Sequence, residues 1–222
     1  MAAPSPSAPG YLWVLSDPGE QATLEEFQDW YDNEHVPLRM QHIPEFLTGA
    51  RYASSDSLTP AWSAAYDISS VALFSDPKYT RLRANRSPRE GALVARLGVL
   101  DRRTCETLGQ TSAPPHASEA PKFVATLAGE KAPSADELEK LKGVEGWRRS
   151  HMHRVYDSLI IGHGKTPESN AAPKFVVIHE FDTEAYASTP EYAAACEGKD
   201  EVRRWKLYKA TANTAPKEAG RG

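Results

Sequence analysis

The sequence predicts an α+β protein in which one βαββαβ unit occurs twice. Residues 63–82 and 176–195 align without gaps, so that Tyr79 matches Tyr192, which lies 113 positions later. Each segment reads as a strand, a turn and a helix, and the flanking segments repeat one order in both halves, the ferredoxin-like arrangement. Because an antiparallel sheet with helices on one face leaves its other face uncovered, we expect two fused repeats packed sheet to sheet as a pseudo-dimeric α+β barrel.

Local patterns predict the elements of the first repeat. The apolar run YLWVL indicates a buried first strand, and Thr23 followed by Glu26 forms a capping box at a helix start. The segment SDPKY leads into a second helix, and LDRRTCETL is a basic and apolar candidate for the last strand. We expect strands at 11–16, 46–54, 61–68 and 98–108, and helices at 23–36 and 71–85.

The second repeat shows the same signals in the same order. The run KFVATL indicates its first strand, Ser134 with Glu137 forms a second capping box, and STPEY introduces its last helix. The basic and aromatic run VRRWKLYKA suits a final strand. We expect strands at 122–129, 147–157, 173–181 and 202–211, and helices at 134–142 and 183–197.

Three segments rich in proline, alanine, serine and glycine separate or flank these repeats. Such segments contain too few large apolar residues to build a core. We therefore divide the chain into a disordered N-terminus (1–10), a first repeat (11–108), a linker (109–121), a second and diverged repeat (122–213), and a disordered tail (214–222).

Charge, cysteine content and apolar runs limit the partners and the cellular setting that we expect for this protein. The net charge of −4 gives no reason to expect nucleic acid or an anionic membrane surface as a partner. Cys105 and Cys196 are the only cysteines, which favours a reducing, cytoplasmic setting over a disulfide framework. The first ten residues lack the features of a signal peptide, and no apolar run approaches the about 18 residues of a membrane span.

The stretch WYDNEHVPLRM at residues 30–40 is the strongest candidate for chemistry. Tyr31 and His35 lie four positions apart, on the same side of the expected helix. Pro37 should end that helix, which places His35 in its last turn. A histidine there can act as a general acid or base near neutral pH, or it can simply interact with the last carbonyls of the helix.

This stretch, followed by IPEFLTGARY, resembles the signature of the EthD-like proteins of the dimeric α+β barrel superfamily. That signature is similar to an aromatic pair, two variable residues, Glu-His, one variable residue and Pro, with a Pro-Gly-Phe turn into a strand. The match covers residues 11–105, and the second half matches only in topology and over 173–197. One departure is Pro44-Glu45, where the family has Pro-Gly, so that turn can differ in shape.

The resemblance implies a ferredoxin-like fold with a hydrophobic cavity between the sheet and the helices. It also implies a cofactor-independent cyclase, decarboxylase, dehydratase or oxygenase, of a kind that often acts on aromatic polyketides. The family's histidine falls on His35, as an acid/base or substrate-anchoring group. Since the second half lacks the motif, we expect the first half to hold the site and the second half to serve as its lid.

Strand alternation adds candidates for the walls of a pocket. Trp62 and Tyr66 share one face of their strand, and their counterparts Phe175 and His179 share a face of theirs. This face lines either the pocket or the core beneath the helices. We take as substrate-binding candidates Trp30, Tyr31, Arg39, Tyr52, Trp62, Tyr66, His151, His153 and His179.

The segment WRRSHMHRVY places His151 and His153 on one strand face. Three interpretations remain open for this pair. They line a polar pocket wall, they face solvent, or they chelate a metal with a third ligand such as His163 or His179. No carboxylate or cysteine lies at a matching short spacing, so we assign no metal site.

These observations predict a cofactor-independent lyase or cyclase that acts on a hydrophobic, carbonyl-containing, polyketide-like metabolite. His35 would be the catalytic residue, working without cofactor or metal on a cyclisation, dehydration or decarboxylation. The alternatives are a non-catalytic small-molecule binder and a haem-dependent, peroxidase-like relative with His179 or His153 as axial ligand. The expected partner is a small hydrophobic molecule, and the chain is a monomer (a pseudo-dimer) or a homodimer.

Overall fold

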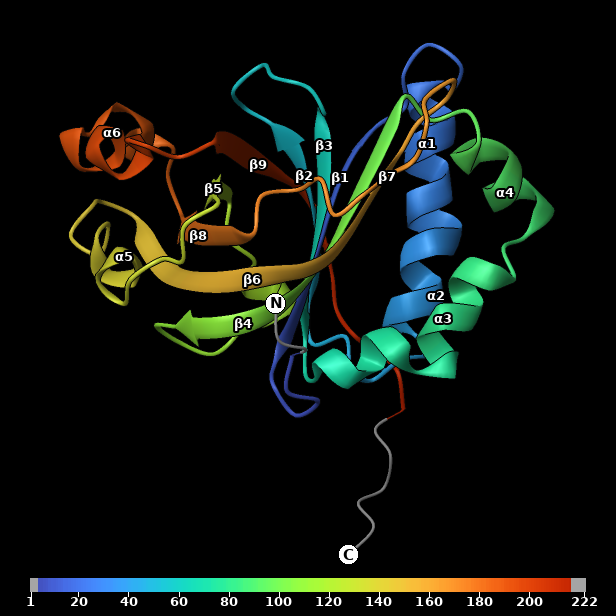
Figure 1. The fold of residues 1–222 in the computed structure, drawn as a ribbon, viewed down its shortest axis with the longest axis horizontal. Coiled ribbons are helices and arrows are strands. Elements are labelled where there is room, and N and C mark those ends of the chain that lie inside the picture. The colour runs from blue at the N-terminus through green and yellow to red at the C-terminus, as the bar shows by residue number, and fades with distance from the viewer. Residues whose placement is uncertain (1–3, 217–222) are drawn as a thin grey trace, which may run out of the picture.

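One closed antiparallel barrel forms the centre of the computed structural model, which describes residues 4–216 (Figure 1). The strands are β1 (Gly10–Asp17), β2 (Gly49–Ser54), β3 (Trp62–Ile68), β4 (Val99–Gln110), β5 (Phe123–Gly129), β6 (Trp147–Ile161), β7 (Glu168–Ser169), β8 (Phe175–Phe181) and β9 (Glu201–Thr211). Eight of them follow the order β4-β1-β3-β2-β9-β5-β8-β6, and β6 pairs again with β4. The short β7 pairs with β6 outside this ring.

The predicted fold class, two ferredoxin-like repeats whose separate sheets pack face to face, is wrong. Each half contributes four strands, in the orders β4-β1-β3-β2 and β9-β5-β8-β6, but the two sets belong to one sheet. β2 pairs with β9 and β4 pairs with β6, so backbone hydrogen bonds join the halves at both seams. Closure gives each of the eight barrel strands two neighbours, whereas two separate sheets would each expose two rows of N–H and C=O groups.

Helices are few, and they lie on two opposite sides of the barrel (Figure 1). The first half supplies α1 (Leu24–Trp30), the π-helical turn η1 (Tyr31–His35), α2 (Val36–Met40), the 3₁₀ turn η2 (Val71–Ser75), α3 (Pro77–Ala84) and α4 (Pro88–Val94). The second half supplies α5 (Asp136–Glu139), η4 (Ala185–Ser188) and α6 (Pro190–Cys196), after the connecting turn η3 (Ala117–Glu119). Within residues 4–216, no helix is long and apolar enough to cross a membrane.

The first helical segment continues through a proline. Thr23 caps its start by accepting a hydrogen bond from the Glu26 amide, as the capping box predicts. The prediction that Pro37 ends the helix is wrong, because α2 follows η1 without a break. In η1 the Val36 amide bonds to the Tyr31 carbonyl, a π-helical spacing. This turn shifts the hydrogen-bond pattern by one residue, and Pro37 then occupies the first turn of α2, where no amide donor is needed.

Strand alternation sorts side chains between the inside of the barrel and its helix-covered outside. Buried residues from all eight barrel strands, including Tyr11, Trp13 and Trp205, form the interior core. A second core lies between the outer faces of β1 and β3 and the first-half helices. A third lies under the second-half helices. The face shared by Trp62 and Tyr66 is therefore the one that packs against helices.

The segments between and outside the predicted repeats make specific contacts. From the predicted linker, Pro115, His116, Ala120 and Pro121 line a small pocket together with Tyr11 and Tyr52. At the start of the predicted tail, the Thr214 amide donates a hydrogen bond to the Met40 carbonyl. The outermost residues of both predicted disordered ends lie outside the part of the chain that the structure describes.

Candidate active site

A cavity that is partly open to solvent lies between the outer face of the barrel and the first-half helices. β1, β3 and β4 supply its apolar floor, which consists of Leu12, Val14, Ala64 and Leu100. Its aromatic and polar lining comprises Tyr31, His35, Arg39, Tyr66, Tyr79, Arg83, Arg86, Glu90 and Arg102. A cavity between sheet and helices is what the family resemblance implies.

His35 forms a pair with a carboxylate in this cavity. Its Nδ1 lies 2.9 Å from Oε1 of Glu90, the third residue of α4. Glu90 is held in place because its amide bonds to the Ser87 hydroxyl, which caps α4. The rings of Trp30 and Tyr31 lie 4.5 and 5.1 Å from the His35 ring. The π-helical turn therefore delivers His35 to a position between an aromatic cluster and a fixed carboxylate.

The surroundings keep His35 uncharged near neutral pH. Burial and then the positive charge of Arg39 lower the pKa of His35 to about 3, against the opposing effect of Glu90. Burial raises the pKa of Glu90, but the hydrogen bond and the electrostatic interaction with His35, together with the charges of Arg39 and Arg86, outweigh burial, and the pKa of Glu90 is lowered. An ionised Glu90 can only accept a hydrogen bond, so Nδ1 of His35 carries the proton. The other ring nitrogen, Nε2, then has a free lone pair, and it has no hydrogen-bond partner among the described residues.

Further polar groups in the cavity lack partners. The Tyr66 hydroxyl, on β3, is buried and makes no hydrogen bond with any residue that the structure describes. Arg39 donates from Nη1 to the His35 carbonyl at 2.6 Å, while its Nε is unpaired. An unsatisfied buried polar group costs free energy, so such groups facing a cavity point to a ligand or to water.

Two predicted binding residues support this cavity without lining it. Trp30 is fully buried, and its ring contacts both His35 and Phe27. Trp62 packs between Phe27 and Tyr208 at the edge of the same core. The structure thus brings His35 together with Tyr31, Arg39 and Tyr66, and it places the two tryptophans behind them.

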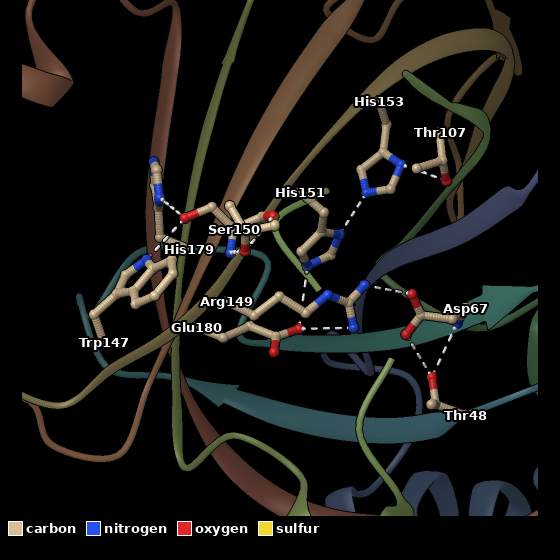
Figure 2. Close-up of polar contacts among 11 residues, drawn as sticks. Thr48, Asp67, Thr107, Trp147, Arg149, Ser150, His151, His153, His179 and Glu180 are labelled. Carbon is tan, nitrogen blue, oxygen red and sulfur yellow. Dashed lines mark hydrogen bonds and ion pairs between the residues drawn. The ribbon is translucent and has the colours of Figure 1, made fainter. Parts of the chain in front are cut away.

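His151 and His153 lie inside the barrel, where both rings contact Tyr11 of the interior core, and Figure 2 shows their polar contacts. They are therefore on the opposite face of the sheet from the cavity. Nδ1 of His151 is 2.6 Å from Nε2 of His153, and Nε2 of His151 is 3.1 Å from Oε1 of Glu180. Nδ1 of His153 is 3.1 Å from the Thr107 hydroxyl. Burial lowers the pKa of both histidines well below the ordinary value. All four ring nitrogens are occupied by protein partners.

An arginine closes this interior network (Figure 2). Nη2 of Arg149 lies 2.7 Å from Oδ1 of Asp67, and its Nη1 lies 3.7 Å from Oε1 of Glu180. Asp67 also accepts a hydrogen bond of 2.8 Å from Thr48. Tyr52, another predicted binding residue, belongs to the same interior core. Arg149 and Asp67 come from different halves of the chain, so the network links the halves.

His179 lies on the outer face of the second half, apart from both groups. Its Nδ1 is 2.8 Å from the Ser150 hydroxyl, which also accepts a hydrogen bond from the Trp147 indole (Figure 2). Burial lowers the pKa of His179 to about 3. Neither His179 nor His153 lines the cavity of His35, and both nitrogens of His153 are engaged, so these contacts do not favour either as a haem ligand.

Within residues 4–216, no three or more His, Cys, Asp or Glu side chains are arranged to hold a metal ion. His163 is exposed and lies against the Ala95 carbonyl, far along the chain from the interior pair. His179 is on the other face of the sheet from His151. The third ligand that a metal site would have needed is therefore not beside the two interior histidines.

Sequence reasoning missed Glu90 and the helix that carries it. The sequence patterns assign residues 86–97 to neither a helix nor a strand. The segment SPRE at 87–90 has the capping-box pattern, with serine followed three positions later by glutamate, and proline in the first turn. That signal could have revealed α4, although nothing local to it indicates a contact with His35.

No protein-family model matches the sequence, and no curated protein matches it either. Solved structures share the fold. An anthrone oxidase-like protein superposes with a TM-score of 0.59 and 12% identity, over 96% of this chain and 97% of that one. A candidate monooxygenase from Fusobacterium nucleatum superposes with a TM-score of 0.54 and 9% identity, over 93% and 95%. At these identities the likeness shows a shared fold, and the EthD-like assignment stays a prediction.

Proposed function

We propose that this protein is a cofactor-independent lyase or cyclase that acts on a hydrophobic, carbonyl-containing metabolite of the polyketide kind. One observation carries the proposal. An uncharged histidine, oriented by a carboxylate, lines a cavity that has an apolar floor and an unpartnered tyrosine hydroxyl. Oriented base and oxyanion donor are the two parts that enolisation requires.

The first step follows from the positions of these groups. Nε2 of His35 removes a proton from the carbon next to the substrate carbonyl, and Glu90 stabilises the imidazolium that forms. The Tyr66 hydroxyl donates a hydrogen bond to the oxygen of the developing enolate, and the charge of Arg39 supports it. General base catalysis of this kind contributes about 10²–10⁴ in rate.

The enolate then attacks a second carbonyl group, whose oxygen takes the proton from the His35 imidazolium, or it expels a β-hydroxyl group, which leaves as water with that proton. In a decarboxylation, the enolate would instead form as carbon dioxide leaves, and His35 would then protonate its carbon. The apolar floor would hold a flexible substrate in the folded shape that ring closure needs. The anthrone oxidase-like neighbour is named for an aromatic ketone, the class of compound proposed here. That name also favours a second candidate, in which molecular oxygen oxidises the same enolate.

Deuterium exchange tests the first step without knowledge of the natural substrate. In D₂O, the protein should accelerate exchange at the methyl carbon of 2-acetylnaphthalene, followed by NMR. His35→Ala should lower the accelerated rate at least about tenfold. His179→Ala, which removes a buried histidine from the other half, is the matched control and should leave the rate unchanged. Thermal unfolding of both variants establishes that they are folded.

Other outcomes distinguish the alternatives. Binding of the ketone with no exchange would favour a non-catalytic carrier, and exchange at the wild-type rate in His35→Ala would remove His35 from the mechanism. Oxygen uptake in step with ketone loss would favour oxidation over cyclisation. A Soret absorption band would favour the haem-dependent alternative.

A further inference from the structure

The mouth of the His35 cavity carries positive charges that the proposed proton transfer does not use. Arg83 on α3, Arg86 in the α3–α4 connection and Arg102 on β4 line the cavity, and none of the three is fully buried, which places them toward its solvent-open side. The chain as a whole has a net charge of −4, so this cluster does not reflect a generally basic protein. Three guanidinium groups from separate elements converge on one opening.

These arginines are poorly paired within the protein. Arg83 and Arg86 make no hydrogen bond or ion pair with any described residue. Arg102 donates from Nη2 to Asp157 at 2.7 Å, but its Nε is buried without a partner. Arg103, one position further along β4, points into the barrel and bonds to Asp101 and Glu201. The interior Arg103 thus has two carboxylate partners, whereas the three cavity arginines share one among the described residues, Asp157.

Three converging guanidinium groups with a single carboxylate partner, Asp157, among the described residues repel one another unless an anion binds. Arg83 is half-buried, and its burial followed by the charge of Arg102 lowers its pKa. Like charges in a partly desolvated site repel each other, and a bound anion would reverse this cost. Arg86 lines the same cavity as His35 and Glu90, so this mouth and the proposed base belong to one continuous site.

We propose that the ligand of this cavity carries a carboxylate, which Arg83, Arg86 and Arg102 bind at the mouth while the apolar body lies on the cavity floor. Guanidinium groups form paired, charge-assisted hydrogen bonds with carboxylates, which makes arginine the suitable residue. The carbonyl end would then reach His35 and Tyr66, a placement that rests on the proposed function.

This arrangement also bears on the reaction. A carboxylate bound by several guanidinium groups is stabilised as an anion before the reaction, and its loss as carbon dioxide would move that charge away from them. The clamped carboxylate therefore acts as an anchor and not as a leaving group. A bound carboxylate that stays on the ligand fits cyclisation or dehydration at the carbonyl end better than decarboxylation.

Binding of a matched pair of probes tests the clamp. The probes are 6-acetyl-2-naphthoate and its methyl ester, which differ in charge and hardly in the shape of the aromatic ketone. We expect wild-type protein to bind the acid about tenfold more tightly than the ester by isothermal titration calorimetry. The double variant Arg83→Gln with Arg86→Gln should lose this preference and keep its affinity for the ester.

Arg81→Gln provides the control, since Arg81 is exposed on α3 and lies outside the cavity. It removes one positive charge from the same helix and should retain the preference for the acid. Equal binding of acid and ester by wild-type protein would overturn the clamp, as would an undiminished preference in the double variant. Loss of the preference in Arg81→Gln would also overturn it, because general electrostatic attraction would then explain the data.

The same probes separate failure of the clamp from failure of the proposed function. His35→Ala should retain the preference for the acid and lose deuterium exchange at the acetyl group. A retained preference with no exchange in wild-type protein would contradict the base and leave the clamp supported. Exchange that requires His35, together with equal affinity for both probes, would contradict the clamp alone.

Discussion

Two histidine–glutamate pairs in this protein have similar geometry and different surroundings. Nδ1 of His35 lies 2.9 Å from Glu90, and Nε2 of His151 lies 3.1 Å from Glu180. The second nitrogen of His35 is unpaired beside a cavity, whereas that of His151 is bonded to His153. A hydrogen-bonded pair is therefore not a site by itself. What distinguishes the outer pair is a free nitrogen next to space that a substrate can enter.

The largest expected effect is a loss of stability when the arginine beside the interior pair, Arg149, is replaced. Arg149→Met should lower the free energy of unfolding by about 3–5 kcal/mol, because it leaves Asp67 and Glu180 buried without their cation. Urea denaturation measures this loss. Arg81→Gln, on an exposed helix position, should change stability by less than about 0.5 kcal/mol. A loss below about 1 kcal/mol in Arg149→Met would show that the interior network is not structural.

The pH dependence of stability tests whether burial alone keeps these histidines uncharged. His179 is buried beside a hydroxyl with no carboxylate partner, and its pKa is about 3. The unfolded chain binds its proton below about pH 6.5, so the contribution of His179 to stability is present above that pH and lost as the pH falls toward 3. Between pH 7 and 5 this loss is about 2 kcal/mol.

A variant isolates that contribution. The decrease in unfolding free energy from pH 7 to pH 5 should be smaller in His179→Gln than in wild-type protein by about that amount. His42→Gln, at an exposed histidine, should behave like wild-type protein. An identical decrease in all three proteins would mean that His179 is charged in the folded state.

The carboxylates of the two pairs can be compared directly. Glu90→Gln keeps an acceptor for Nδ1 of His35 but removes the charge that stabilises the imidazolium, so deuterium exchange should fall about tenfold. Glu180→Gln should leave the exchange rate of the folded protein within about twofold, since Glu180 lies inside the barrel. Equal losses in the two variants would contradict the assignment of the outer pair as the site.

The smallest expected effect is at Tyr66, where one substitution should raise stability and lower the rate of deuterium exchange. Its buried hydroxyl has no partner among the described residues, so Tyr66→Phe should stabilise the fold by about 1 kcal/mol while slowing exchange. Tyr186→Phe is the control in the second half, where the hydroxyl lies 3.5 Å from the Val124 carbonyl, and it should give no gain. A destabilised Tyr66→Phe would show that the hydroxyl has a structural partner.

Local patterns predicted the parts of this protein that depend on neighbouring residues. Thr23 caps its helix as expected, although the Glu26 carboxylate bonds to Arg96 instead of completing the capping box. The side chains of β3 alternate between the two cores as expected. The repeat spacing of 113 residues also corresponds to structure, since Trp62–Ile68 and Phe175–Phe181 are both strands at that offset. His35 was selected from a short motif, and it lines the cavity. These features follow from backbone propensity and side-chain period, which a short window of sequence contains.

Tertiary structure decided the rest. Pairing of β2 with β9 and of β4 with β6 closes one barrel, because satisfying strand edges depends on segments far apart in the chain. The same closure placed His151 and His153 in the interior and set Glu90 beside His35, 55 positions away in sequence. The sequence by itself determined which residues can act as bases. Only the fold decided which of them has a free nitrogen beside a cavity, since burial and contact are properties of packing and not of a motif.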